Sequence, residues 1–254
     1  MRYLKTVLYD KRVQEAEYIS DLLSDLYKHR VDVSDIKTVA SDKTAVSVSF
    51  AGTLCILGTR EGVESAKSLG LPFVTYDLED SESLCIILGF EDIDADLCEK
   101  WYERSRDIPW EIAITDRLVI RELSVEDDLS EAGEPWCDKE YIKDYIKNQY
   151  RLFGYGIWAV TLKEGGNIIG QAGIVNAGED GEPELGYAIF PDFRRKGYAY
   201  EAITAVLKYV KEKLYIDTLK VCISKDNIPS EKLFYRLKSA ENIDNTVSLE
   251  YTNR

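Results

Sequence analysis

Histidine is almost missing from this chain, because His29 is the single one among its 254 residues. A serine or cysteine nucleophile with a histidine base would have to use His29. A single imidazole also excludes any zinc site with two or more imidazole ligands. His29 follows an amphipathic stretch at residues 13–28, so we expect it at the exposed end of a helix and assign it no function.

The five cysteines are an odd number, are widely scattered and include no close Cys-x-x-Cys pair. This spacing excludes the usual metal and redox motifs, so we predict no metal site. We expect most of them to be small buried hydrophobic residues, and Cys222 to lie in a sheet core because it alternates within residues 219–223. The five are Cys55, Cys85, Cys98, Cys137 and Cys222.

Long apolar runs are absent as well. No stretch approaches the length that crosses a bilayer, and the apolar run within residues 2–10 is too short for a signal peptide. We therefore expect a cytoplasmic protein with no membrane partner. A chain of 254 residues is long enough for two domains with cores of their own.

Positive charge is scarce, with 32 Lys and Arg against 46 Asp and Glu and a net charge of -14. A surface that follows nucleic-acid phosphates needs many basic contacts, so we expect no nucleic-acid partner. The basic residues crowd between Arg194 and Lys238. The acidic remainder either favours a cationic amine substrate or is an ordinary solvated surface, and composition leaves both open.

A basic glycine turn is the most informative motif. Residues 194–199 read Arg-Arg-Lys-Gly-Tyr-Ala, between a strand expected at residues 183–190 and an amphipathic helix that opens near Tyr198. The amino end of a helix presents unpaired N–H groups and a partial positive charge. Gly197 lets the backbone approach a ligand with no Cβ in the way. We predict that the turn binds a pyrophosphate.

Strand, turn and helix together resemble the acetyl-CoA site of the GNAT N-acetyltransferase superfamily. Its signature is Gln or Arg, two variable residues, Gly, one variable residue, then Gly or Ala, and Arg194, Gly197 and Ala199 occupy the fixed positions. Over roughly the last 140 residues, a plausible domain length, further segments are similar to the branch that acetylates ribosomal-protein amino termini. These segments are residues 117–123, 184–187, 201–202 and 226–230.

The resemblance implies an α+β domain with a mixed, mainly antiparallel sheet, acetyl-CoA as cofactor, and an amine acceptor on a protein or small molecule. It also implies that N–H groups of residues 195–199 hold the pyrophosphate and that residues 188–190 pair with the pantetheine arm. An N–H of Ile189 or Phe190 would face the oxyanion. Asn227 would hold the pantetheine amide or cap a helix, and Ser230 would cap that helix or contact the cofactor. The predicted cofactor-binding residues are Ile189, Phe190, Arg194, Arg195, Lys196, Gly197, Tyr198, Ala199, Asn227 and Ser230.

Glu184 is the candidate general base, because strand alternation places it on the side of Gly186 and Ala188. A merely solvated carboxylate is the alternative reading of Glu184. The alternative bases are Glu134, Asp138 and Glu140.

Many members of the superfamily place a Tyr seven residues beyond the Asn, where it protonates the leaving thiolate, and Phe234 stands there in this chain. Tyr235 is the candidate acid, although it lies about 100° further round a helix. Core packing of both rings is the alternative. Residues 237–240 replace the usual Leu-Gly-Phe by Leu-Lys-Ser-Ala, a departure that bears on the acceptor wall.

Residues 1–106 alternate short apolar strands with helices, which predicts a Rossmann-like parallel sheet. A linker at 107–116 and the acetyltransferase domain at 117–254 are expected to follow. Expected strands cover residues 36–40, 53–57, 72–76 and 84–88, and expected helices cover residues 13–28, 43–50, 60–69 and 94–105.

Residues 58–72 resemble a late segment of haloacid dehalogenase-like phosphatases, and Asp42 is similar to their metal-side acid. Phosphoryl transfer in that family needs an Asp-x-Asp pair after the first strand, and the sequence offers none there. We therefore expect a degenerate domain that serves stability, dimerisation or substrate presentation. Three activities stay open: an N-acetyltransferase, a catalytically weak acyl-CoA-binding module with a partner-binding front domain, and a phosphatase.

Overall fold

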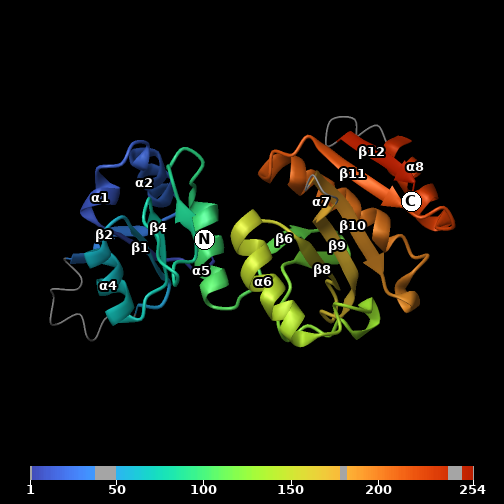
Figure 1. Cartoon of the computed structure of the whole chain (residues 1–254), viewed down its shortest axis with the longest axis horizontal. Helices are drawn as coiled ribbons and strands as arrows, with labels where there is room; N and C mark the ends of the chain where they lie inside the picture. Colours follow the sequence, from blue (N-terminus) through green and yellow to red (C-terminus); the bar gives the residue numbers. More distant parts are fainter. Residues whose placement is uncertain (1, 38–49, 178–181, 240–247, 254) are drawn as a thin grey trace. The chain divides into compact units, whose positions relative to one another are not determined.

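The computed structural model describes residues 2–37, 50–177, 182–239 and 248–253. The chain divides into two compact units, Met1–Ile108 and Pro109–Arg254, drawn in blue to green and in green to red in Figure 1. Each unit has a sheet of its own. Within the described ranges, no helix combines the length and the apolar character needed to cross a bilayer.

The first unit is a parallel sheet in the order β2-β1-β3-β4-β5. Strand β3 is buried at every position, as expected of a parallel strand covered on both faces. The predicted Rossmann-like sheet is therefore confirmed. The strands are β1 (Thr6–Tyr9), β2 (Asp32–Asp35), β3 (Thr53–Leu57), β4 (Phe73–Tyr76) and β5 (Ile86–Ile87), and the helices are α1 (Lys11–Gln14), α2 (Ile19–Lys28), α4 (Arg60–Leu69) and α5 (Ala95–Ser105).

Three predictions for this unit need correction. Strand β1 was not expected, although it lies between β2 and β3 in the sheet. The helix expected at residues 13–28 is two helices, because Tyr18 adopts a left-handed conformation with φ 60° just before α2. The strand expected at residues 36–40 lies earlier, at β2. Asp42 and residues 43–49 of an expected helix lie outside the described residues.

The side chain of Asp10, which directly follows β1, occupies the point between β1 and β3 where the strand order of the sheet reverses. Its Oδ2 accepts hydrogen bonds from the N–H groups of Gly58 (3.0 Å) and Thr59 (2.8 Å) and from the Thr59 hydroxyl (2.7 Å). Its Oδ1 accepts one from the Val13 N–H (3.2 Å). Arg12 follows two positions later and pairs with Asp77, so an Asp-x-Asp pair is absent from this strand end.

The second unit is a seven-stranded sheet in the order β12-β11-β10-β9-β8-β7-β6. Strands β6 to β10 pair antiparallel, while β10, β11 and β12 pair parallel, which confirms the mixed, mainly antiparallel sheet. Residues 111–114, expected within a linker, form the edge strand β6 instead. The strands are β6 (Glu111–Ile114), β7 (Leu118–Arg121), β8 (Ile157–Leu162), β9 (Ile168–Ala177), β10 (Glu182–Ile189), β11 (Thr218–Ile223) and β12 (Ser248–Asn253), and the helices are α6 (Lys139–Phe153), α7 (Tyr198–Lys213) and α8 (Ile228–Ser239).

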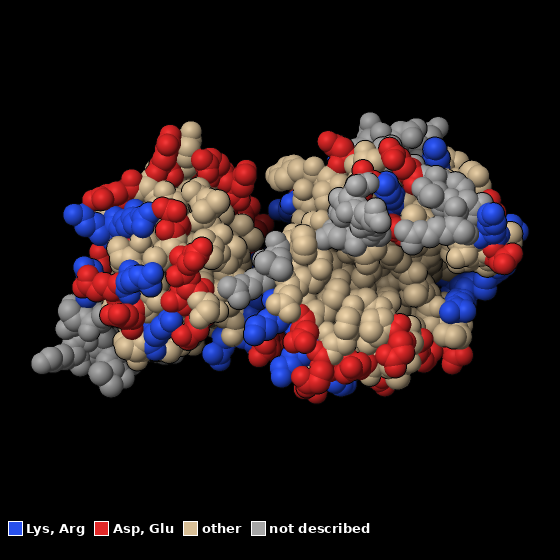
Figure 2. Space-filling model, viewed as in Figure 1, with Lys and Arg blue, Asp and Glu red and all other residues tan. Residues whose placement is uncertain are grey.

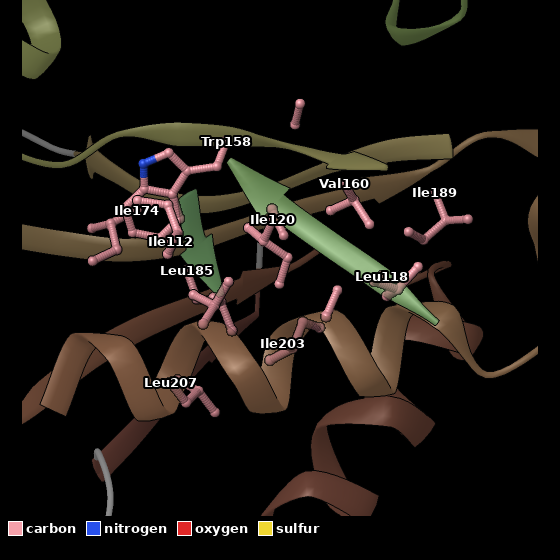
Figure 3. Packing of buried hydrophobic residues seen from close by; sticks show 14 of the residues in the cluster. Ile112, Leu118, Ile120, Trp158, Val160, Ile174, Leu185, Ile189, Ile203 and Leu207 are labelled. Atoms are coloured by element: carbon pink, nitrogen blue, oxygen red, sulfur yellow. The ribbon is translucent and has the colours of Figure 1, made fainter. Parts of the chain in front are cut away.

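Helix α7 lies along one face of this sheet and buries the apolar stripe that its sequence predicts. Figure 3 shows Ile203 and Leu207 of α7 facing Leu185 of β10 and Trp158 of β8. Ala202, Val206 and Val210 of the helix are also fully buried. Burial of large aliphatic side chains contributes about 1.5–3 kcal/mol each, so this face fixes the start of α7 against the end of β10.

The cysteines and His29 fit the expectation only in part. Cys55 and Cys98 are buried, but Cys137 is exposed and Cys85 and Cys222 are half-buried. Cys222 lies in strand β11 of the sheet, but its side of the strand is only partly covered, so it is not a core residue in full. His29 caps the carboxyl end of α2 and is exposed, as predicted.

Candidate active site

The basic glycine turn joins β10 to α7. Strand β10 ends at Ile189, a short 3-10 turn (Pro191–Phe193) follows, and Gly197 is the N-cap of α7 with φ 85°. Arg195 also has a positive φ of 61°. A Cβ on Gly197 would meet Arg117 at 3.5 Å, so glycine is needed for the left-handed backbone rather than for space.

The N–H groups of this turn have no acceptor among the residues that the structure describes. The cap of α7 has no side-chain hydrogen bond, and no N–H from Arg195 to Ala199 makes a hydrogen bond to any described residue. A helix of 16 residues therefore presents its positive end, beside two arginines and a lysine, to whatever binds there. Arg194, Arg195, Lys196, Gly197, Tyr198 and Ala199 are consecutive residues of this turn and of the start of α7.

Arg117 holds this turn from the segment between β6 and β7, a role that the sequence did not indicate. Its Nη1 donates to the carbonyl oxygen of Lys196 (3.1 Å), and its guanidinium stacks over the ring of Tyr198 at 4.4 Å. Its Nε donates to the Oε2 of Glu201 (2.7 Å), and its Nη2 lies 2.6 Å from the same atom. One side chain thus fixes the glycine turn and the first turn of α7 together.

The negative charge of Glu201 is balanced by the groups around it. Its Oε1 accepts hydrogen bonds from the Thr115 hydroxyl (2.6 Å) and the Arg117 N–H (3.0 Å). Burial opposes ionisation, but these hydrogen bonds and the Arg117 charge outweigh it and lower the pKa of Glu201. A carboxylate in the first turn of a helix competes with a bound anion unless it is paired. The pairing with Arg117 leaves the helix end available for a diphosphate.

Strands β10 and β11 separate next to this turn. Within the described ranges they pair at Glu184 and Lys220 alone, whereas β10 and β9 stay paired along eight positions. The residues of β10 beyond Glu184 are mostly only partly buried, although β10 lies inside the sheet. The backbone of β10 therefore has an open edge that leads to the glycine turn.

The open edge carries the N–H of Ile189 but not that of Phe190. The Phe190 N–H donates to the Ile169 carbonyl of β9 (2.8 Å), so of the two N–H groups predicted to face the oxyanion only that of Ile189 stays a candidate. Successive residues of a strand point their N–H groups to opposite neighbours, which turns Ile189 and Tyr187 toward the open edge. The Ile189 carbonyl oxygen accepts from Arg194 Nε at 2.8 Å and ties the strand end to the turn.

Glu184 lies where strand alternation predicted it, on the face that also carries Gly186 and Ala188. It lies five positions before Ile189, about 17 Å along an extended strand. A proton from an amine near Ile189 would therefore reach Glu184 through water. Of the alternatives, Asp138 caps α6 by accepting from the Glu140 N–H (2.9 Å), Glu140 is exposed, and Glu134 is exposed and bonds Cys137.

Asn227 and Ser230 lie at the start of α8. Asn227 Oδ1 accepts from the Ser230 N–H at 3.3 Å, which is a helix-capping contact. Burial raises the pKa of Tyr187, and a hydrogen bond with the Ser230 side chain opposes this rise. Ser230 thus links α8 to β10 across the open edge.

Phe234 and Tyr235 take different environments. Phe234 is buried in the core, whereas Tyr235 is 55% exposed. Their rings contact edge to face at 5.5 Å. Core packing is therefore confirmed for Phe234 and wrong for Tyr235, because the turn of the helix carries the second ring outward.

The face of the sheet opposite α7 is the second part of the site, and we call it the acceptor face: Gln171 and Gly173 of β9 with Glu184, Gly186 and Ala188 of β10. Figure 2 shows a mostly uncharged depression across this unit, with Lys and Arg at one end and Asp and Glu along its rim.

Helix α6 contacts β8 beside the acceptor face. The Ile157 N–H donates to the Tyr145 hydroxyl (2.7 Å), and the Tyr150 hydroxyl donates to the Ile157 carbonyl oxygen (2.5 Å). Burial raises the pKa of Tyr145 to about 12, so it stays a neutral phenol. Tyr145 also packs against Trp136 (4.9 Å) and Tyr141 (6.1 Å), which form an aromatic wall.

Comparison with known proteins identifies the family. The family model described as "Acetyltransferase (GNAT) domain" matches residues 109–238. The chain belongs to the GNAT acetyltransferases. The matched residues run from the edge strand β6 to helix α8, so they include the glycine turn, the open edge of β10 and the acceptor face.

Two curated relatives are named as N-acetyltransferases. The chain is 26% identical over 108 residues to the uncharacterized N-acetyltransferase YjdG of Bacillus subtilis (strain 168), covering 40% of this chain and 64% of that one. It is 27% identical over 145 residues to the uncharacterized N-acetyltransferase p20 of Bacillus licheniformis, covering 50% of this chain and 81% of that one. A solved acetyltransferase of Agrobacterium tumefaciens str. C58 aligns with 49% of this chain and 80% of its own, at 27% identity and a TM-score of 0.42.

Proposed function

We propose that this GNAT acetyltransferase transfers an acetyl group from acetyl-CoA to a primary amine, on a protein or peptide amino terminus or on a small molecule, by direct attack on the thioester. The observation that carries this proposal is the glycine turn. Its N–H groups from Arg195 to Ala199 have no acceptor among the described residues, and they lie at the end of a strand whose edge is open.

The residues present fit the diphosphate and the pantetheine arm of acetyl-CoA. The turn offers consecutive N–H donors and three cationic side chains to a doubly charged group. The open edge of β10 offers main-chain donors and acceptors to the amide groups of an extended arm, in the way an added strand would pair. Asn227 and Ser230 flank that edge from α8.

Bound acetyl-CoA supplies an activated acyl group, and the protein supplies orientation and charge stabilisation. The N–H of Ile189 faces the open edge and stabilises negative charge on the thioester oxygen, an effect worth about 3–4 kcal/mol when one such donor is removed from other acyl-transfer enzymes. Glu184 takes the amine proton through a chain of water molecules, because about 17 Å of strand lies between it and Ile189.

The leaving thiolate has no tyrosine in the slot that Phe234 occupies. A thiol with an ordinary pKa of about 8.5 is a fairly good leaving group, so water is a sufficient proton donor. We keep Tyr235 as a candidate acid only through a bridging water, because its side chain is exposed. The first unit has no proposed chemistry, and we assign it to stability, dimerisation or substrate presentation.

One observation favours a second function. Phe234 is buried at the position where many members of the superfamily have the tyrosine that acts as the acid. Loss of this acid is expected of an acyl-CoA-binding module with weak turnover. The two functions are separated by measuring free thiol release with acetyl-CoA and a panel of polyamines, aminoglycosides and peptides. We expect thiol release with at least one amine. Binding heat for acetyl-CoA without thiol release would favour the binding module, and no binding heat at millimolar concentration would contradict both.

A further inference from the structure

Two polar side-chain atoms are buried without a hydrogen-bond partner among the described residues, and they lie on opposite faces of the second sheet. One is Nε1 of Trp158, which faces α7, and the other is Oε1 of Gln171. Burying a polar group without a partner costs about 1–3 kcal/mol, so such groups are rare unless something else uses them. The position of Gln171 indicates what uses it.

Gln171 lies on the acceptor face, one strand away from the open edge. It pairs with Ala188 of β10 on one side and with Ala159 of β8 on the other. Ala172 and Ile174, its neighbours along β9, pair with Tyr187 and Leu185 and point to the α7 face. The Gln171 side chain therefore projects from the face that α7 does not cover.

Only a small residue separates Gln171 from the open edge. The Ala188 methyl group stands between them, and adjacent strands are about 4.8 Å apart. Ala188 is partly exposed, whereas Gln171 is 8% exposed. The terminal torsion of a glutamine is broad and roughly two-fold, so rotation turns its oxygen toward Ala188 at small cost. The same rotation gives a buried acceptor its missing hydrogen bond.

We propose that Oε1 of Gln171 accepts a hydrogen bond from an N–H of the acceptor amine and thereby aims the nitrogen lone pair at the thioester. The inference rests on the proposed function, since it needs an amine beside the open edge. A neutral primary amine has two N–H groups, and fixing one of them limits the rotation of the nucleophile. An amide does not take up the proton, so Gln171 orients the amine and leaves the proton to Glu184.

The test uses Gln171→Leu, which keeps the size and removes the acceptor, with Gln171→Glu as the conservative variant. For the best amine of the panel, we expect Gln171→Leu to lower kcat/KM about tenfold, with KM for acetyl-CoA and the midpoint of the pH profile unchanged. Its Tm stays equal or rises, because an unpaired polar atom has left the interior. Gln171→Glu restores most of kcat/KM. The matched control, Trp158→Phe, removes the other unpaired atom and leaves the amine kinetics unchanged.

A binding measurement covers the case in which no panel amine turns over. Conjugates of CoA with spermidine and with a short peptide amino terminus should bind the wild type more tightly than CoA does, and Gln171→Leu should lose about tenfold of that gain. If Gln171→Leu still binds the conjugates more tightly than CoA by the wild-type factor, the role of Gln171 is overturned. The same holds if the wild type binds the conjugates no more tightly than CoA. Absence of CoA binding in the wild type overturns the proposed function instead. A Gln171→Leu variant with lowered Tm and equal losses for both substrates shows a structural role and also overturns the inference.

Discussion

The two units repeat one local design, a strand followed by a glycine-containing turn and a helix, and they differ in what the turn binds. In the first unit, β3 leads through Gly58 and Thr59 into α4, and the carboxylate of Asp10 accepts from both N–H groups. In the second unit, β10 leads through Gly197 into α7, and the N–H groups of the turn have no acceptor among the described residues. The first turn is closed by an internal anion, and the second is open to an external one.

The comparison shows that a helix start beside a strand end is not a binding site by itself. In open parallel sheets, ligands bind where the strand order reverses, and in the first unit Asp10 fills that point. In the second unit, Glu201 in the first turn of α7 is paired with Arg117 and Thr115 and accepts from none of the N–H groups of the turn. Whether a carboxylate accepts from the N–H groups therefore decides which turn can take a ligand.

Placing a carboxylate in the open turn should close it, and this is the largest effect we expect. Gly197→Glu adds a negative charge where a diphosphate binds, and like charges in contact cost several kcal/mol, so CoA affinity should fall roughly 100-fold or more. Gly197→Ala is the control, because it carries only the strain of a positive φ, about 1–2 kcal/mol. Isothermal calorimetry with CoA measures both. Retained tight binding by Gly197→Glu would contradict the placement of the site.

Removing the carboxylate from the closed turn tests the other side of the comparison. Asp10→Ala leaves the buried N–H of Gly58 and the partly buried N–H of Thr59 without their acceptor, which should destabilise the first unit by roughly 3 kcal/mol. Asp10→Asn keeps one amide oxygen and should cost less. Hydrogen exchange of peptides from β1 and β3 measures the loss, and CoA affinity of the second unit serves as the control. Unchanged exchange in Asp10→Ala would show that the turn does not depend on this carboxylate.

The sequence predicts the open turn well because its signals are local. Arg194, Gly197 and Ala199 stand at fixed spacings, and the apolar stripe of α7 sets where the helix begins. Strand β3 and helix α4 have the predicted limits for the same reason: a fully apolar run and an N-cap at Thr59. Elements whose pattern is short or mixed were missed, such as β1 and the edge strand β6.

Long-range pairing is what the sequence does not show. Arg117 and Glu201 are 84 positions apart, and nothing in the sequence near either residue indicates the other. The unpaired oxygen of Gln171 depends on three strands meeting in register, and the use of the Phe190 N–H depends on β9. Such facts follow from sheet register, which a single sequence constrains only through alternation.

Breaking the ion pair between Glu201 and Arg117 should have the smallest effect of the changes proposed here. This effect should depend on pH, because Glu201 is a carboxyl group. Its pKa is lowered from the ordinary 4.5 because hydrogen bonds from Thr115 and Arg117, together with the Arg117 charge, outweigh burial. A carboxyl group whose pKa is lowered by folding stabilises the folded state above its unfolded pKa, and this stabilisation is lost as the pH falls through the folded pKa. We expect urea unfolding between pH 3 and 7 to show a difference in the free energy of unfolding between wild type and Glu201→Gln. This gap should be present at pH 7 and narrow below about pH 4.5.

Arg117→Ala should raise KM for acetyl-CoA about tenfold, because it leaves the charge of Glu201 uncompensated at the helix start. Adding Glu201→Gln should recover part of that loss. A gap that does not change with pH, or a double variant that recovers nothing, would show that Glu201 is held in place without being neutralised by Arg117.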